Sequence, residues 1–283
     1  VDVWYYPDNF ILDFRAGAPP DKYNPEGQNW GFPLFNWHVV KKQDYYFWKQ
    51  RMEYAHHFYD VFRIDHVLGF FRIWSVLKDC DPKLGRFTPS NETVWEEHGR
   101  SHLNKIISLT TMLPIAEDLG VVPSCVGPVL TDLGICGTKV MRWERNYGTD
   151  ESVIPINEYP RLSMTTISTH DSPTLAQWWR DFPEEVSPYC KYKDWEYEKE
   201  ISQQQRLSIL RDSHNTSSLF HINLLQEYLS LVPELSWEDI DQDRINIPGK
   251  ILDTNWTYRF KTCIKKIINN VELKEFFSFI LKK

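Results

Sequence analysis

Acidic residues follow hydrophobic segments at three separate places in this chain, where carboxylates can serve nucleophilic or acid–base chemistry. Asp65 ends the segment "YDVFRID", Glu117 lies near the end of "LPIAED", and Asp171 ends "MTTISTHD". An unpaired carboxylate is costly to bury, so such residues either pair with other groups or lie at the mouth of a site. Cleavage of a glycosidic bond with retention needs two carboxyl groups about 5 Å apart, a nucleophile and a proton donor. The trio therefore suggests this chemistry, with a third carboxylate left to bind sugar hydroxyls.

Basic side chains accompany these acids. Arg63 lies two residues before Asp65, so on a strand it points to the same side and favours the ionised form that a nucleophile requires. His66 and His170 could donate hydrogen bonds to sugar hydroxyls. Two simpler explanations remain open: charged residues are common just past strands, and Asp171 could serve only as a helix cap. Asp and His also bind divalent metals, but the helical i, i+3 or i, i+4 spacing is missing, so we predict no metal site.

The segments that must position these residues alternate between strand and helix. Strands are predicted at 59–65, 113–118, 138–144, 164–171 and 219–225, and helices at 93–110, 123–134 and 171–182. In the last of these helices, Asp171 and Ser172 are candidate caps and Pro173 takes a first-turn position. The polar stretch 191–218 predicts outer-layer helices. This alternation predicts an α/β fold with a parallel sheet, and the acids fall at the strand ends where a (β/α)₈ barrel collects its chemistry.

A closed barrel needs eight strands, and the sequence predicts five. Either the opening strands of a barrel are missing from this sequence, or the sheet is open and doubly wound. The first forty residues do not supply the difference, because they are rich in Pro, Gly, Asn and aromatic residues and predict a long structured loop. Loops of that length are usually lids or binding loops.

The composition of the chain limits the classes of molecule that it could bind. The net charge of −7 argues against nucleic acid, although aromatic residues make up 15% of the 283 residues, with 12 Trp and 14 Tyr. These rings can fill a core, or they can stack on the apolar faces of sugars. No apolar run approaches the length of a membrane span, and no signal peptide is visible. Five scattered cysteines without CxxC spacing predict no disulfide framework or zinc site and fit a reducing, cytoplasmic compartment.

Six blocks, in order, resemble the 4-α-glucanotransferases, also called amylomaltases or disproportionating enzymes. The blocks are "GAPPDKYNPEGQNWGFPLFNW" (17–37), "FRIDHVLGFF" (62–71), "PIAEDLG" (114–120), "TKVMRWE" (138–144), "STHDSPTL" (168–175) and "INIPGKILDTNWTYR" (245–259). The first resembles the lid loop of the family, the second its nucleophile block, the third its acid/base block and the fifth its stabiliser block. The subtype resembles the bacterial maltodextrin-utilising enzymes and their plant cytosolic relatives.

The resemblance implies a role for each residue in these blocks. Asp65 would be the nucleophile, Glu117 the acid/base and Asp171 the transition-state stabiliser, on strands four, five and seven of a TIM-type barrel. Seven further residues would bind substrate around them: Arg63, His66, Asp118, His170, Gln28, Trp30 and Tyr23. Lys22 and Tyr23 stand where many members have two aromatics in a row, so ring stacking there would depend on Tyr23 alone.

The implied activity is a retaining, double-displacement transfer of α-1,4-glucan segments to the 4-hydroxyl of an acceptor glucan or glucose (EC 2.4.1.25). Its substrates would be α-1,4-glucans and maltooligosaccharides, without a cofactor, nucleic acid or membrane. The alternatives are an α-amylase-type hydrolase, disfavoured by "RIDH" and "STHD", and an inert glucan-binding fragment. Residues 1–283 would be one catalytic barrel domain, with a lid at 1–37, holding strands four to eight. Without the earlier strands, we expect these residues alone to be unstable or inactive.

Overall fold

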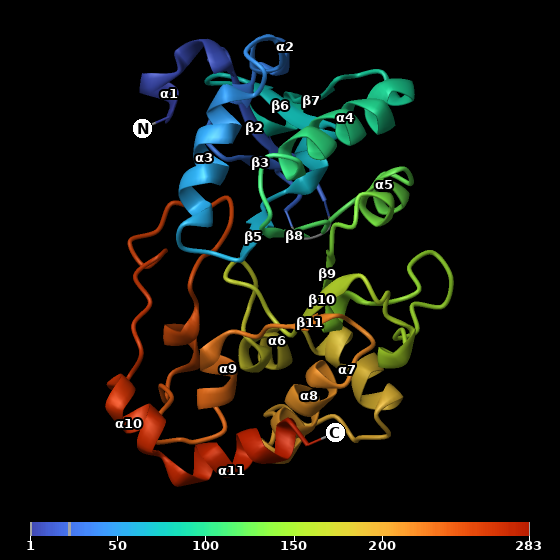
Figure 1. The fold of residues 1–283 in the computed structure, drawn as a ribbon. Helices are drawn as coiled ribbons and strands as arrows, with labels where there is room; N and C mark the ends of the chain where they lie inside the picture. The colour runs from blue at the N-terminus through green and yellow to red at the C-terminus, as the bar shows by residue number, and fades with distance from the viewer. Residues whose placement is uncertain (1, 22–23, 283) are drawn as a thin grey trace. The chain divides into compact units, whose positions relative to one another are not determined.

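The five strands that the sequence predicts are present, although each is shorter than its hydrophobic segment (Figure 1). A computed structural model describes residues 2–21 and 24–282 of the chain. The five strands are β5 (Val61–Ile64), β8 (Leu113–Ala116), β9 (Gly137–Val140), β10 (Ser163–Thr166) and β11 (Phe220–His221). The β5–β8 and β10–β11 pairs are parallel, which confirms the predicted α/β organisation.

The chain divides into two compact units, Val1–Gly137 and Thr138–Lys283. In the first unit, β5 pairs with β8 so that Ile64 lies opposite Ala116. A parallel bridge between Ile115 and Cys136 continues this ladder. Each unit has its own hydrophobic core.

The helices that follow β5 and β8 in the first unit agree with the prediction. They are α4 (Trp95–Ile107) and α5 (Val126–Asp132), and Gly134 just after α5 takes the left-handed conformation of a helix end. Their inner faces bury Leu103, Ile106, Val126 and Val129 completely or nearly so. Each such side chain contributes about 1.5–3 kcal/mol when it is removed from water, so these helices hold the two strands in place.

The predicted long loop at the start of the chain is wrong in part, because this region forms short antiparallel strands. β2 (Phe14–Ala18) is an inner strand of the sheet β3–β2–β6–β7, with β3 at Gln28–Asn29, β6 at Ile73–Leu77 and β7 at Arg86–Thr88. β1 (Phe10–Ile11) pairs with β4 (Leu34–Phe35). β1, β3 and β4 have two residues each, too few to show an alternating pattern, and β2, "FRAGA", combines an arginine with three small residues. The remaining helices of this unit are α1 (Asp2–Tyr5), α2 (Trp37–Lys42) and α3 (Tyr46–His56).

In the second unit, a three-stranded sheet of order β11–β10–β9 is accompanied by six helices among the described residues. These are α6 (Leu175–Asp181), α7 (Pro183–Tyr192), α8 (Gln203–His214), α9 (Leu225–Leu229), α10 (Ile264–Asn269) and α11 (Val271–Ile280). Only α8 and the end of α7 fall in the polar stretch 191–218. Leu210 of α8 and Trp179 of α6 are both fully buried in the core of this unit, so α8 is more than a solvated outer layer.

The cap of α6 differs from the prediction in a way that bears on function. Thr174 caps this helix: its side chain accepts a hydrogen bond from the Gln177 N–H, and the Gln177 side chain accepts one from the Thr174 N–H. The predicted caps, Asp171 and Ser172, therefore lie before the helix. Asp171 does not cap α6, so the simplest non-catalytic explanation for this acid is removed.

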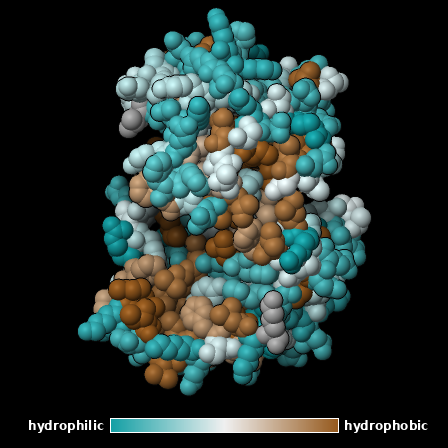
Figure 2. Space-filling view, viewed as in Figure 1, coloured by the Kyte–Doolittle hydropathy of each residue, from teal (hydrophilic) through white to brown (hydrophobic). Residues whose placement is uncertain are grey.

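Apolar side chains gather over α10 and the start of α11 in Figure 2, where Ile264, Ile268 and Val271 are more than half exposed. Neither these helices nor any other helix in the described residues has both the length and the apolar character required to cross a membrane.

Candidate active site

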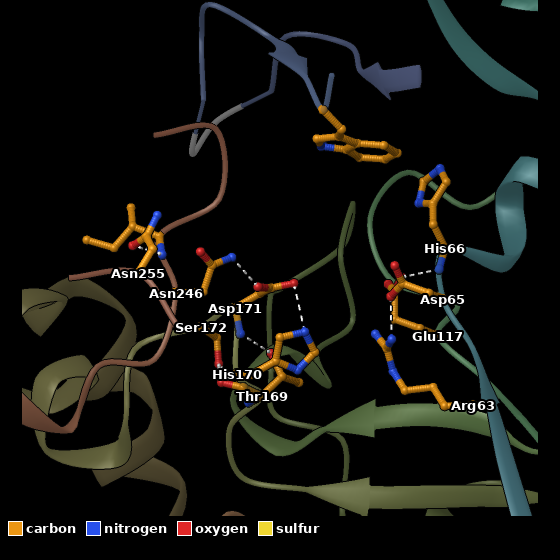
Figure 3. A network of polar contacts seen from close by, with 12 residues as sticks. Arg63, Asp65, His66, Glu117, Thr169, His170, Asp171, Ser172, Asn246 and Asn255 are labelled. Atoms are coloured by element: carbon orange, nitrogen blue, oxygen red, sulfur yellow. Dashed lines mark hydrogen bonds and ion pairs between the residues drawn. The ribbon is translucent and has the colours of Figure 1, made fainter. Parts of the chain in front are cut away.

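Asp65 and Glu117 leave two neighbouring parallel strands at the same edge of the first unit. Ile64 of β5 lies opposite Ala116 of β8, and the two acids are the next residue on each strand. Two backbone hydrogen bonds continue the ladder beyond the strands: Glu117 N–H donates to the Ile64 carbonyl at 2.9 Å, and Val67 N–H donates to the Glu117 carbonyl at 3.0 Å. The two carboxylates lie side by side as a result (Figure 3).

The environment of Asp65 is open and cationic. Arg63 Nη1 forms an ion pair with Asp65 Oδ1, as its position two residues earlier on the strand predicts. The Asp65 side chain is 72% exposed. A charged carboxylate beside a guanidinium, open to an approaching sugar, has the properties of a nucleophile.

Glu117 lies in a different environment one strand away. Burial raises the pKa of Glu117, and the neighbouring Asp65 charge raises it further. Three interactions lower the pKa in opposition. The His66 N–H donates to Glu117 Oε2 at 2.8 Å, and the Leu119 N–H donates to Oε1 at 3.1 Å. The positive charge of Arg63 acts in the same direction as these hydrogen bonds. The pKa remains above its ordinary value, which favours the protonated form that a general acid needs.

His66 follows the end of β5 and contacts Trp30 of the predicted lid segment. Its backbone is left-handed, with φ of 41°, and this conformation accompanies the hydrogen bond from its N–H to Glu117. Burial lowers the pKa of His66 to about 4, so the imidazole is neutral near pH 7. The Trp30 ring meets the imidazole edge-on, with 4.9 Å between ring centroids.

Gln28 and Trp30, which the sequence predicts to lie in a lid, are held by the β2–β3 pairing. Gln28 lies opposite Ala18 on β2, and Trp30 N–H donates to the Ala16 carbonyl at 2.9 Å. The Trp30 indole N–H donates to Gln28 Oε1 at 3.0 Å. Tyr23, the third predicted lid residue, lies outside the described residues.

Gly17 lies in β2 where β3 packs closely against it, and it leaves no room for a side chain. A Cβ atom at position 17 would lie 1.9 Å from the Gln28 carbonyl oxygen, a backbone atom that can move only with its strand. We expect Gly17→Ala to displace β3 and to speed amide exchange at Trp30 by about tenfold or more, since its N–H would lose a protected partner. Hydrogen exchange followed by mass spectrometry would measure this.

The control for this prediction is Gly127→Ala in α5, where an added Cβ meets no atom within 4 Å. That change should leave exchange at Trp30 unaltered. Equal protection of Trp30 in the Gly17→Ala variant and the parent chain would contradict the proposed role of Gly17.

Asp118, the residue after Glu117, lies against the start of β9. A Cβ atom at Gly137 would come within 2.7 Å of Asp118 Oδ2, so the glycine allows this carboxylate to lie close to the backbone. Among the described residues, no three His, Cys, Asp or Glu side chains form a group that could hold a metal ion.

In the second unit, three side chains contact Asp171, and Figure 3 shows two of them, His170 and Asn246. His170 Nε2 lies 3.2 Å from Asp171 Oδ2, and Asn246 Nδ2 donates to Asp171 Oδ1 at 2.7 Å. Arg244 Nη2 donates to the Asp171 carbonyl at 3.0 Å. Burial lowers the pKa of Arg244, while the Asp171 charge acts in the opposite direction.

Sequence reasoning assigned no role to Arg244, Asn246 or Trp256. All three belong to the segment 244–259, where Asn246 N–H donates to the His170 carbonyl and Trp256 N–H donates to the Ile245 carbonyl. The Trp256 ring lies 5.4 Å from the His170 ring. The only signal in the sequence was the resemblance of block 245–259, which gave no contact partner.

The structure thus forms two clusters from the predicted residues. One, in the first unit, joins Arg63, Asp65, His66 and Glu117, and His66 contacts Trp30 of the predicted lid segment. The other, in the second unit, joins His170 and Asp171 to Asn246. The convergence of Asp171 with the other two acids on one sugar stays a prediction.

Known proteins provide an independent comparison. Residues 1–265 match the family model described as 4-alpha-glucanotransferase. A 4-alpha-glucanotransferase of Chlamydia pneumoniae is 44% identical over 94% of this chain and 50% of its own length. One of Chlamydia caviae is 42% identical over 99% of this chain and 53% of its own length. The chain spans about half the length of these curated relatives.

Solved structures agree in fold. An amylomaltase of Streptococcus agalactiae, solved in complex with acarbose, is similar with a TM-score of 0.78 and 26% identity, covering 99% of this chain and 53% of that one. An amylomaltase of Corynebacterium glutamicum gives a TM-score of 0.76 at 20% identity, covering 99% and 44%. The second similarity concerns the fold alone.

Proposed function

Because this chain belongs to the 4-alpha-glucanotransferase family, we propose that the natural protein transfers segments of α-1,4-glucans to the 4-hydroxyl of an acceptor glucan or glucose. The observation that carries the proposal is the contrast between two adjacent carboxyl groups. Asp65 is exposed and paired with Arg63, whereas the pKa of Glu117 is raised by burial. Environments that differ in this way separate a nucleophile from a proton donor.

The proposed reaction has two displacements at one anomeric carbon. Asp65 attacks this carbon while Glu117 gives its proton to the departing sugar oxygen, and a glucan ester forms on Asp65. The 4-hydroxyl of the acceptor then attacks the ester as Glu117 takes its proton, and Asp65 leaves as a carboxylate. Retention at the anomeric carbon follows from the two inversions, and the steps need no cofactor.

The remaining residues have proposed roles around this centre. Asp171, oriented by His170 and Asn246, would stabilise the oxocarbenium-like transition state by binding sugar hydroxyls. Asp118 and the neutral imidazole of His66 would contact hydroxyls near the acid/base, and Gln28 would bind donor or acceptor sugars. These roles come from the family resemblance, and the local contacts are compatible with them.

We also propose, from the family resemblance, that the five predicted strands belong to a (β/α)₈ barrel. β5, β8, β9, β10 and β11 would be five consecutive strands of a (β/α)₈ barrel, strands four to eight. The support is the parallel pairing of β5 with β8 and of β10 with β11, the neighbouring order β11–β10–β9, and the structural similarity to amylomaltases.

Incubation of the natural protein with maltotriose alone would test the function. A transferase should produce glucose together with maltooligosaccharides longer than the substrate, which chromatography resolves. Products no longer than maltotriose would indicate an α-amylase-type hydrolase, and an unchanged substrate would indicate a protein that only binds glucan.

Trp30 offers a test of how transfer prevails over hydrolysis. Its ring packs against His66 beside Glu117 and stacks with Phe32 at 5.8 Å, so it can exclude water from the ester and support the acceptor. We expect Trp30→Ala to raise the ratio of hydrolysis to transfer by about tenfold, measured as reducing ends released per longer product formed.

Tyr54→Ala is the matched control, because Tyr54 of α3 is 71% exposed and lies outside the segment 1–37 that the sequence predicts as the lid. It should leave the ratio unchanged. A Trp30→Ala enzyme with the parent product ratio would argue against a water-excluding lid.

A further inference from the structure

Glu227 is a buried acid to which the proposed reaction gives no role. It lies in α9, and only 2% of its surface is exposed. Its Oε1 atom accepts two hydrogen bonds, one from the Ser168 hydroxyl and one from the Leu175 N–H, the latter at 2.9 Å. The two donors stand on either side of His170 and Asp171 in the chain. One carboxylate oxygen thus joins both ends of the loop 168–175.

Further hydrogen bonds hold the loop between these two donors. Thr169 N–H donates to the Ser172 hydroxyl oxygen at 2.8 Å, and Arg142 Nη1 donates to the Pro173 carbonyl at 2.9 Å. Asn223, in the turn before α9, accepts a hydrogen bond from Ile167 N–H at 2.8 Å. The segment 223–227 therefore bonds to Ile167, the residue after β10, and to both ends of the loop.

The surroundings of Glu227 indicate that burying its carboxyl group is energetically unfavourable by itself. Burial raises the pKa of Glu227, while the hydrogen bonds from Ser168 and Leu175 and the charges of Arg206 and Arg142 oppose this effect. A buried acid needs such compensation, and an apolar residue of similar size would often be as stable. A carboxylate is useful here because one oxygen can accept from both donors, one at each end of the loop 168–175.

We propose that Glu227 is the positioning residue of Asp171: it closes the loop 168–175 and so fixes the place of the carboxylate that the loop carries. Being buried, Glu227 cannot reach a substrate and acts only through the loop. Asn246 orients the Asp171 side chain at its tip, whereas Glu227 fixes the backbone below. This inference rests on the proposed function, in which Asp171 stabilises the transition state.

The test is a kinetic comparison in the natural protein with maltotriose as donor and acceptor. Glu227→Leu removes the acceptor, and we expect kcat to fall about 30- to 100-fold with KM changed less than threefold, because misplacing a catalytic group affects the transition state more than substrate binding. Glu227→Gln retains an acceptor oxygen and should recover kcat to within about fivefold of the parent enzyme.

A double-mutant cycle separates positioning from general destabilisation. In an Asp171→Asn background, Glu227→Leu should lower kcat less than threefold further, because the group that it positions is already disabled. Glu185→Leu is the matched control: Glu185 is also buried in this unit and accepts from the indole N–H of Trp178, which lies in α6 and outside the loop 168–175. It should lower the melting temperature while leaving kcat within twofold.

Ser168→Ala keeps the test decisive if Glu227→Leu does not fold. It removes one of the two donors, and we expect kcat to fall about fivefold or more at unchanged KM, again without additivity to Asp171→Asn. Full additivity, or a kcat equal to that of the Glu185→Leu control, would overturn the positioning role. If the parent protein does not disproportionate maltotriose at all, the proposed function fails instead, before any variant is compared.

Discussion

Replacing Asp65 by asparagine is expected to lower kcat for transfer by about 10⁴-fold or more, because the amide cannot form the glucan ester on which both displacements depend. Asn has nearly the shape of Asp, so the strand end and its register with β8 should persist. Initial rates of glucose formation from maltotriose would measure the loss. Calorimetry with a maltooligosaccharide should show binding within a few-fold of the parent affinity.

Asp60→Asn provides the control for this variant. Asp60 is exposed and lies just before β5, at the opposite end of the strand from Asp65, where its carbonyl accepts the Leu113 N–H. The same change of charge there should leave kcat within twofold of the parent value. Substantial turnover by Asp65→Asn would assign the nucleophile to another group and remove the basis of the mechanism.

The second large effect concerns Glu117 and depends on the leaving group. Glu117→Gln should reduce kcat for maltotriose by about 10²- to 10⁴-fold, the contribution that a general acid makes. With a glucosyl fluoride donor, whose departing fluoride needs no protonation, the first displacement should be largely spared. The ester would then accumulate on Asp65, and mass spectrometry of the peptide that contains this residue would detect it.

The pH dependence of the same variant gives an independent measurement. Burial raises the pKa of Glu117, and the first displacement needs its protonated form. In the parent enzyme, kcat/KM should therefore fall as the pH rises through this pKa, and the raised value moves the fall to higher pH. Glu117→Gln cannot lose a proton, so its profile should lack the alkaline limb. A limb that persists would mean that another group supplies the proton.

The sequence predicted the strands well because each one is a largely hydrophobic segment, and four of the five segments end in an acid. Asp65 and Glu117 were predicted to lie near each other from that pattern alone, and the β5–β8 register accounts for it. The pairing of Arg63 with Asp65 follows from the two-residue repeat of a strand. Periodicity and residue type therefore sufficed wherever the contacts were local or lay between neighbouring strands.

Contacts between distant segments were not predictable in this way. Asn246 lies 75 residues from Asp171, and Glu227 lies 59 residues from Ser168. No local pattern in the sequence indicates that these pairs meet, because their meeting depends on how the intervening helices pack. The cap of α6 was misjudged for a local reason, since Thr174 and Gln177 compete with Asp171 and Ser172 for the same helix start.

Asp65 and Glu117 each follow directly after a pair of residues, Ile64 and Ala116, that lie opposite each other in β5 and β8. This placement also bears on the stereochemistry of the reaction. Adjacent strands in any sheet lie about 4.7–4.9 Å apart, close to the spacing that favours a covalent sugar ester over direct attack by water. The ladder of amide bonds between two backbones would then dictate the anomeric outcome. Exchanging surrounding loops could alter which sugars are accepted, yet an inverting enzyme would require moving one acid to a different strand.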